Sequence, residues 1–155
     1  MTTSTANSAG STDLSSEQVI VRGKANGFLQ EVTACRHTFR VDEPVSAGGT
    51  EAAPDPYDYL LGALGACTSM TVGWYARRHQ IPLEGVTVTL GHTRIHAKDC
   101  EECASKIGML DRIDMTVQLT GPITPEQQVK LMEVAAKCPV HRTLTSEIEI
   151  KLRAA

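Results

Sequence analysis

A single long helix, predicted over residues 55–78, is the sequence feature that most constrains how this chain can fold. Asp55 is a favourable N-cap, and Pro56 is tolerated in the first turn because the N–H that proline lacks has no intrahelical partner there. Positive residues at 77–79 lie in the last turn, where the helix dipole favours them, and Pro82 prevents continuation. The apolar run is too short and interrupted to span a membrane, which needs ~20 mostly apolar residues. We therefore predict a core helix.

The core half of this helix, with Cys67 beside it, is built from the small residues Gly62, Ala63, Gly65 and Ala66. Glycine inside a helix costs ~1 kcal/mol relative to alanine, so Gly62 and Gly65 indicate that another backbone approaches closely. We predict that the partner is a helix. Cys67 by itself is consistent with a small core residue, because free cysteine is among the most buried residue types. Three- and four-residue spacing predicts a shared face for Leu60, Leu61, Leu64, Cys67, Thr71 and Trp74.

Length and composition predict one domain over residues 17–155, preceded by a disordered Ser/Thr-rich tail over residues 1–16. The net charge of -3 and the lack of a basic patch with interleaved aromatics argue against nucleic-acid binding. The tail has no apolar stretch of the kind a signal peptide needs, so we expect a cytoplasmic protein with reduced thiols. The five cysteines are then expected to be catalytic, metal-binding or structural rather than permanently paired.

The remaining segments predict an α+β fold with the element order βββαββαβ. Alternating apolar residues indicate strands, and the Thr124-Pro125 start with Gln127 at the capping-box position indicates a second helix. The predicted strands are 18–24, one or two within 28–41, 85–96, 110–119 and a closing strand 147–152.

A second cysteine lies at a predicted helix start. Pro139 directly after Cys138 places the cysteine at the N-cap and the proline in the first turn. The positive end of the helix dipole and the neighbouring Lys137 both stabilise a thiolate, which lowers the pKa of a thiol. A buried structural thiol at a turn is the alternative. The local electrostatics favour a reactive Cys138.

Two motifs in this order carry a resemblance to a known family. The stretch from Asp55 to Cys67, followed by Cys138-Pro139-Val140-His141-Arg142, resembles the OsmC/Ohr family and, more narrowly, its OsmC-like branch. The similarity covers roughly residues 18–152. The resemblance implies an intertwined homodimer in which central helices pack together and antiparallel sheets from both chains wrap around them.

The resemblance also implies a thiol-dependent peroxidase that reduces organic hydroperoxides or hydrogen peroxide without a metal or other cofactor. Cys67 is then the peroxidatic thiol, which becomes a sulfenic acid, and Cys138 is the resolving thiol that condenses with it to a disulfide. A dithiol reductant reopens that bond by exchange. The expected partners are therefore a second copy of the chain, a peroxide and a dithiol.

One departure from the family concerns the groups that polarise the peroxide. Ohr-type members have an arginine on an early strand and a glutamate after the Asn-Pro that starts the central helix. Here Tyr57 follows the proline, and Asp58 comes one place later, about 100° further round the helix. Asp58 and His37 are the candidate substitutes. Their alternatives are a first-turn acid favoured by the dipole and a solvated strand residue.

Two other functions stay open at this stage. His92, His96, Cys100 and Cys103 have spacings that suit a zinc site, although residues 92 and 96 of a strand are roughly 13 Å apart. The acidic loop around the cysteines is equally consistent with an uncommitted loop or an accessory thiol pair. The second of these two functions is that of a non-catalytic small-molecule binding protein with the same fold.

Overall fold

The computed structural model describes residues 18–100, 103–104 and 107–154. The chain divides after Pro56 into two compact units, the first ending at Pro56 and the second beginning at Tyr57. Their secondary structure is α+β with antiparallel sheets, as predicted. The tail predicted for residues 1–16 lies outside the described residues. No helix in the described part of the chain is long and apolar enough to cross a membrane.

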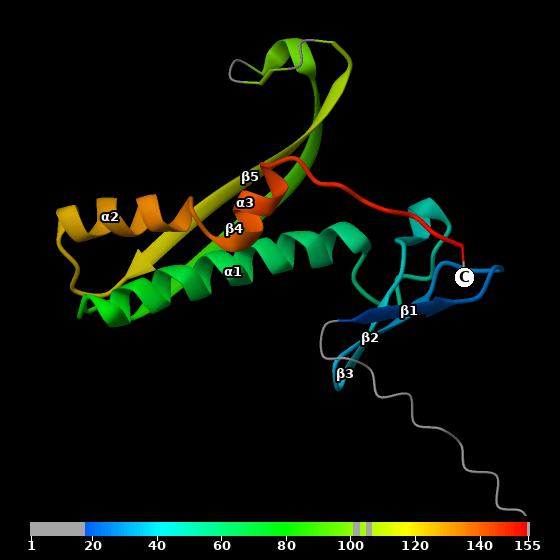
Figure 1. Cartoon of the computed structure of the whole chain (residues 1–155), viewed down its shortest axis with the longest axis horizontal. Helices are drawn as coiled ribbons and strands as arrows, with labels where there is room; N and C mark the ends of the chain where they lie inside the picture. Colours follow the sequence, from blue (N-terminus) through cyan, green and yellow to red (C-terminus); the bar gives the residue numbers. More distant parts are fainter. Residues whose placement is uncertain (1–17, 101–102, 105–106, 155) are drawn as a thin grey trace, which may run out of the picture. The chain divides into compact units, whose positions relative to one another are not determined.

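The first unit is a three-stranded antiparallel sheet in the order β1-β2-β3 (Figure 1). Val32 is its buried centre and stands opposite Val21 on one side and Phe39 on the other. The turn between the second and third strands places Cys35 at a φ of 53°. The strand bounds are Val19–Gly23 for β1, Gln30–Ala34 for β2 and His37–Val41 for β3, which confirms the predicted strands.

Asp42 organises the loop that follows β3 and contains the short 3-10 helix η1 (Val45–Ala47). Its buried carboxylate accepts backbone hydrogen bonds from Glu43 at 2.9 Å, from Thr50 at 3.1 Å and from Ala52 at 3.1 Å. The Thr50 hydroxyl donates a fourth, at 2.5 Å. Because all four donors stabilise the ionised form, and the Thr50 hydroxyl most strongly, they lower the pKa of Asp42 to about 2.

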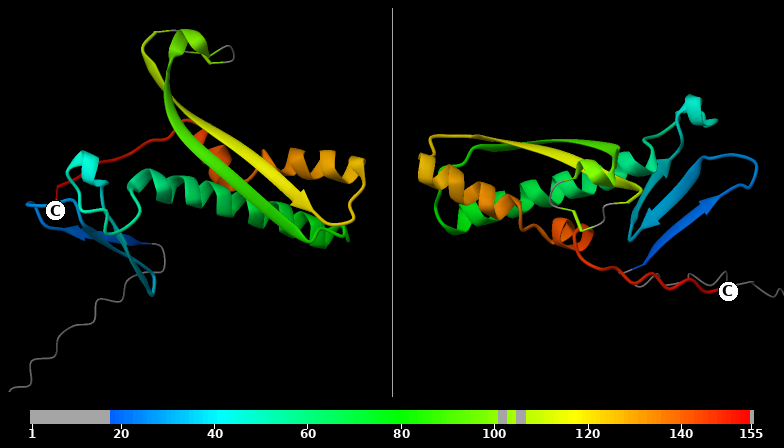
Figure 2. Two further views of the ribbon diagram at one scale, coloured as in Figure 1. Left: turned by 180° about the vertical axis from the view of Figure 1, so that it is seen from behind. Right: turned by 90° about the horizontal axis from the view of Figure 1, so that it is seen from above.

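The second unit combines helices with a long antiparallel hairpin (Figures 1 and 2). Strands β4 and β5 pair along their whole length, from Gly85 opposite Thr120 to His96 opposite Met109, and the hairpin tip extends beyond the helices (Figure 1). The bounds are α1 Pro56–Arg78, β4 Gly85–His96, the 3-10 helix η2 Ala97–Asp99, β5 Met109–Thr120, α2 Pro125–Ala135 and α3 Pro139–Leu144.

The core of this unit lies between α1, α2 and the hairpin. Val72 and Ala76 of α1 pack with Leu131 and Ala135 of α2. Every second residue of β5 from Ile113 to Leu119 is turned inward, as its alternation predicts. The capping box of α2 is also confirmed: the Thr124 side chain accepts from the N–H of Gln127, whose side chain accepts from the N–H of Thr124.

The buried face of α1 differs from the predicted one. The buried residues are Leu64, Gly65, Thr68, Val72 and Ala76. Trp74, assigned to the apolar face by spacing, is instead 56% exposed. The close approach at Gly65 is also made by a strand: a Cβ there would lie 2.8 Å from Leu90 of β4. Within the described chain, the small residue is thus explained by the hairpin rather than by a helix.

The predicted closing strand over residues 147–152 is wrong for this chain. Residues 147–154 form no regular secondary structure, and Ile148, Ile150 and Leu152 are all exposed. The alternation that predicted a strand is present, but no described strand edge pairs with the segment. A strand needs a neighbour to satisfy its backbone groups, and sequence alternation does not supply one.

Candidate thiol active site

Cys67 and Cys138 are neighbours although 71 positions separate them in the sequence. The Cys67 side chain lies within hydrogen-bonding reach of the Cys138 sulfur and lowers the pKa of that thiol. Cys67 is half-buried in the middle of α1, and Cys138 is fully buried at the start of α3; neither belongs to a disulfide. A thiol pair in hydrogen-bond contact can close to a disulfide after oxidation of either sulfur.

The start of α3 positions Cys138 as predicted from the Cys-Pro pair. Cys138 is the N-cap residue, with extended backbone (φ -63°, ψ 149°), and Pro139 is the first residue of the helix. The N–H of His141 donates to the Cys138 sulfur at 3.3 Å. The sulfur thus takes the place of the oxygen that usually caps a helix N-terminus.

Thr68 is the third member of the site and was not singled out by sequence reasoning. Its buried hydroxyl lies 3.4 Å from the Cys138 sulfur, within donating distance, and 3.8 Å from that of Met115 on β5. Thr68 directly follows Cys67 on α1, so the two side chains approach the Cys138 sulfur from adjacent positions of the helix. The signal for Thr68 was its place beside the cysteine, but its partner could not be read from the sequence.

Two opposing effects set the acidity of Cys138. Burial raises the pKa of the thiol, because a thiolate is poorly solvated inside the protein. Hydrogen bonds from Thr68, the His141 N–H, Cys67 and the Val140 N–H stabilise the thiolate. Together they outweigh burial, and the pKa of Cys138 is lower than that of an ordinary thiol. The low pKa predicted for Cys138 is therefore present, with hydrogen bonds as its cause.

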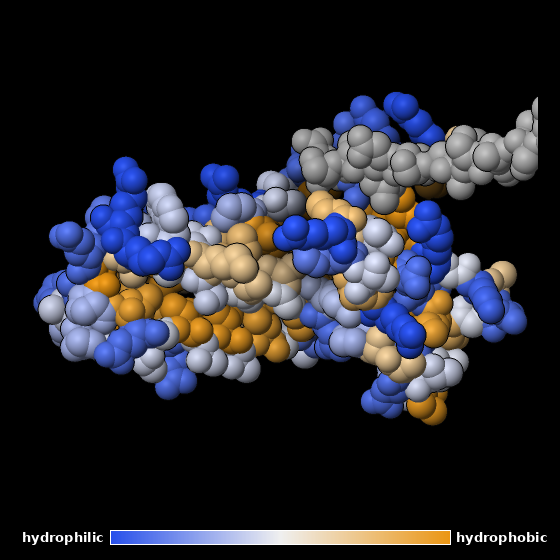
Figure 3. Space-filling model, turned by 90° about the horizontal axis from the view of Figure 1, so that it is seen from below, coloured by the Kyte–Doolittle hydropathy of each residue, from blue (hydrophilic) through white to orange (hydrophobic). Residues whose placement is uncertain are grey.

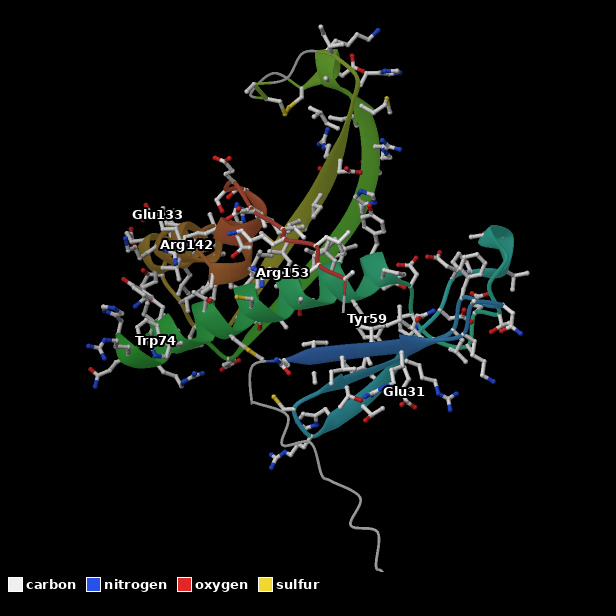
Figure 4. All side chains as sticks on the ribbon, turned by 45° about the vertical axis from the view of Figure 1, so that its right-hand side comes forward. Glu31, Tyr59, Trp74, Glu133, Arg142 and Arg153 are labelled. Atoms are coloured by element: carbon white, nitrogen blue, oxygen red, sulfur yellow. A yellow bond between two sulfur atoms is a disulfide. The ribbon has the colours of Figure 1, made fainter. Side chains whose placement is uncertain are left out.

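An apolar cleft of about 510 Å³ opens beside Cys67. Met70 and Trp74 of α1 and Pro139 of α3 are among the residues that line it. Figure 3 shows a hydrophobic band on the face of the second unit that is seen from below. Trp74 projects from the C-terminal half of α1 in Figure 4. Cys67 lines the cleft whereas Cys138 does not, so a molecule in the cleft meets the Cys67 sulfur first.

The other two predicted catalytic residues lie apart from the sulfur pair or in the other unit. Asp58 is exposed in the first turn of α1, nine residues before Cys67, which is ~14 Å along the helix axis. It does not line the cleft. His37 is exposed at the start of β3 in the first unit. Catalytic roles for Asp58 and His37 stay predictions.

The residues proposed for zinc do not gather into a site. Cys100 and Cys103 form a disulfide, which removes both thiolates as ligands. His92 instead contacts Asp111 on β5 at 3.0 Å. Among the described residues, no group of three or more potential ligands could hold a metal ion.

Comparison with known proteins places the chain in a family. The family model described as OsmC-like protein matches residues 48–153, which include Cys67, Thr68 and Cys138. This chain belongs to the OsmC family. The family resemblance predicted from the two cysteine motifs is thereby confirmed. No curated protein matches the sequence.

Solved structures share the OsmC-family fold. An OsmC-like protein from Mycoplasma pneumoniae has a TM-score of 0.64 and 16% identity, over 82% of this chain and 85% of that one. An organic hydroperoxide resistance protein OsmC from Legionella pneumophila has a TM-score of 0.61 and 19% identity, over 83% and 88%. One from Elizabethkingia anophelis, named an organic hydroperoxide resistance protein and bound to thiocyanate, has a TM-score of 0.62 and 19% identity, over 84% and 89%. These similarities establish the fold.

In this OsmC-family chain, Tyr57 occupies the position at which the resemblance implies a glutamate in Ohr-type members. Its ring stacks on His92 of β4 with centroids 4.3 Å apart. His92 contacts the Asp111 carboxylate, and Arg94 also reaches that carboxylate, at 3.7 Å. The start of α1 is thus attached to the hairpin by an aromatic and ionic cluster.

Proposed function

We propose that this OsmC-family chain is a thiol-dependent peroxidase that reduces organic hydroperoxides or hydrogen peroxide. The observation that carries the proposal is the contact between a cleft-lining Cys67 and a buried Cys138 of lowered pKa. The apolar walls of the cleft suit the hydrocarbon part of an organic hydroperoxide. Two of the structural relatives are named organic hydroperoxide resistance proteins, which is consistent with this chemistry.

In the first step, Cys67 attacks the peroxide. Only a thiolate is nucleophilic enough, and the low pKa favours the charge on Cys138, which is walled off from the cleft. The Cys138 thiolate therefore accepts the Cys67 proton through their hydrogen bond as the Cys67 sulfur attacks one peroxide oxygen. The O–O bond breaks, the leaving oxygen takes a proton and departs as alcohol or water, and Cys67 becomes a sulfenic acid.

In the second step, Cys138 resolves the sulfenic acid. Its sulfur attacks the Cys67 sulfur, forms the disulfide and releases the oxygen as water. Because the two side chains are already in contact, this closure competes well with further oxidation of Cys67. A dithiol then reduces the disulfide by exchange. Such a cycle needs a reducing compartment, which supports the predicted cytoplasmic location.

The proposal includes a homodimer. Met70 and Trp74 of α1 are 71% and 56% exposed, and the alternating apolar residues near the C-terminus have no partner in the described chain. Exposed apolar surface of this extent marks an interaction site. A second copy that covers α1 and pairs with residues 147–152 fits both features. Multi-angle light scattering of the purified protein measures the mass directly, and a monomer at micromolar concentration would contradict this part.

Mass spectrometry tests the peroxidase proposal. Protein reduced and then freed of reductant receives one equivalent of cumene hydroperoxide, and its cysteine peptides are mapped. The expected result is a loss of two hydrogens in a peptide that joins Cys67 to Cys138, together with one equivalent of cumyl alcohol. Oxidation confined to other cysteines, with the 67 and 138 thiols intact, would exclude the assigned site.

Two variants serve as matched controls for that experiment. Cys67→Ser removes the proposed attacking sulfur and should abolish alcohol formation. Cys35→Ser removes an exposed cysteine that lies in the other unit and is not in a disulfide, and it should leave the yield unchanged. Equal loss in both variants would show that nonspecific thiol oxidation accounts for the turnover.

The apolar cleft also favours a second candidate, a small-molecule binding protein without turnover. The two functions differ in their dependence on sulfur. A binding protein keeps its affinity for an apolar ligand in the Cys67→Ala variant and consumes no peroxide in any variant. A peroxidase loses turnover in that variant, whatever the affinity.

A further inference from the structure

The tip of the β4–β5 hairpin carries a disulfide that the proposed peroxidase cycle does not use. Cys100 and Cys103, separated by two residues, are joined there, and both are partly exposed (Figure 4). Cys35, Cys67 and Cys138 are not in disulfides. The chain therefore holds one closed sulfur pair in addition to the open pair between α1 and α3.

The closed pair is remote from the open one along the same hairpin. Leu90 of β4 packs at Gly65, and Met115 of β5 lies beside Thr68, so the open pair sits at the middle of the hairpin. From Leu90 the strand continues to His96 before the tip begins, which adds ~20 Å at the rise of a β-strand. Figure 1 shows the tip projecting beyond the helices. The two pairs are thus separate centres within one chain.

The Cys100–Cys103 bond adds little to the fold. The base of the tip is already closed by the hairpin and by the Ala97 N–H, which donates to the Gly108 carbonyl at 2.8 Å. Ala97 is fully buried and Gly108 has a φ of 90°, which fixes the turn on both sides. A disulfide stabilises by restricting the unfolded chain, and the restriction is smallest for a short ring such as this one. A structural role therefore does not explain the pair.

The spacing and exposure instead fit a site of thiol–disulfide exchange. Cysteines with two residues between them are the arrangement of redox-active pairs, in which thiol pKa values are commonly lowered. Both cysteines are partly exposed at a projecting tip, so an incoming thiolate can approach the S–S bond from solvent. We propose that Cys100 and Cys103 form a second redox centre, which takes two electrons from a dithiol. This proposal is independent of the peroxidase activity.

The exchange balances without any other reactant. A thiolate of the dithiol attacks one of the two sulfurs, which breaks the Cys100–Cys103 bond and forms a mixed disulfide. The second thiol of the reductant then attacks its own bound sulfur and leaves as a cyclic disulfide. Two electrons and two protons pass from the dithiol to the cysteines. With a monothiol, the freed cysteine lies beside the mixed disulfide and expels the monothiol, so the ring closes again. The centre should therefore favour dithiols.

The test uses the full chain with Cys35→Ser, Cys67→Ser and Cys138→Ser, which leaves only the pair at the tip. Dithiothreitol or glutathione is added at equal thiol concentration without oxygen, the exchange is quenched with acid, and free thiols are alkylated with N-ethylmaleimide. We expect two labels per chain after dithiothreitol and ~10-fold less labelling with glutathione. Oxidised dithiothreitol should reverse the labelling. A matched variant that also carries Cys100→Ser and Cys103→Ser should take up none.

Two results would overturn the proposal. Labelling only after the protein is unfolded would mean that the bond is structural. Equal labelling with both reductants, or before either is added, would mean that the two cysteines are ordinary thiols. Circular dichroism of the variants before the reaction confirms that they are folded. Because the proposed peroxidatic and resolving thiols are absent, neither result bears on the peroxidase proposal.

Discussion

The Thr68 hydroxyl and the Cys138 sulfur face each other at 3.4 Å in the fully buried region between α1 and α3. Among the groups that lower the pKa of Cys138, this hydroxyl has the largest effect. Thr68 thus lowers the pKa of a thiol that is 70 positions away in the sequence.

The Thr68→Val change keeps the shape of the side chain and removes the donor. The pKa of Cys138 should rise, because the thiolate loses the hydrogen bond that lowers that pKa most, and a hydrogen bond to a charged group is worth ~1.5 kcal/mol. Oxidation of Cys67 should slow by up to ~10-fold at neutral pH, because less Cys138 thiolate is available to accept its proton. Stopped-flow fluorescence of Trp74, which lines the cleft, can follow the reaction against pH.

Thr68→Ser is the matched control for that measurement, because it retains the hydroxyl and should retain the pH profile. A Thr68→Val protein with an unchanged profile would show that the hydroxyl does not set the acidity of Cys138.

Asp42→Asn should weaken the protein in a pH-dependent way. The folded pKa of Asp42, about 2, lies below its ordinary value of 3.8, so the carboxylate stabilises the fold fully above that ordinary value. This stabilisation is lost as the pH falls from 3.8 through 2. The difference in urea midpoint between native and variant protein should therefore be large at pH 6 and shrink in strong acid. A difference that stays constant with pH would contradict the assignment.

Two glycines of α1 should respond differently to alanine. No atom outside the helix lies within 4 Å of a Cβ built at Gly62, so Gly62→Ala should stabilise by the helix propensity of ~1 kcal/mol. At Gly65 the new methyl meets Leu90 at 2.8 Å, and the leucine must move, which offsets that gain. Thermal unfolding of both variants measures the contrast. Destabilisation by Gly62→Ala would reveal that a second copy covers this part of the helix.

Leu131→Ala should destabilise the second unit by ~2–5 kcal/mol, because it empties a fully buried position between α1 and α2. Val129→Ala on the same helix removes an exposed side chain and should cost less than about 0.5 kcal/mol. Urea denaturation measures the free energy of unfolding of each variant. Similar losses in both variants would contradict the placement of the core.

The elements predicted best from the sequence are those defined by local chemistry. The capping box at Thr124 and the Cys138-Pro139 helix start each depend on a few adjacent residues, and both are present. The buried face of α1 was predicted less well. Its core half is glycine and alanine, so apolar spacing alone favoured Trp74 over the buried Val72. Side-chain size and packing against β4 decide that orientation, and neither is encoded in the local pattern.

The site itself was predictable in part. The two cysteines could be singled out, one by its helix start and both by the family resemblance. Thr68 could not, because a buried hydroxyl gains its role from a sulfur 3.4 Å away that is distant in the sequence. The Cys100–Cys103 bond was likewise left open between a metal site, a loop and a thiol pair, because spacing alone fits all three.

The unpaired apolar residues Ile148, Ile150 and Leu152 have a practical consequence for handling the protein. An exposed alternating segment can template intermolecular β-pairing, so protein in which a C-terminal tag keeps this segment from a partner should precipitate more readily during expression. An affinity tag is better fused ahead of β1.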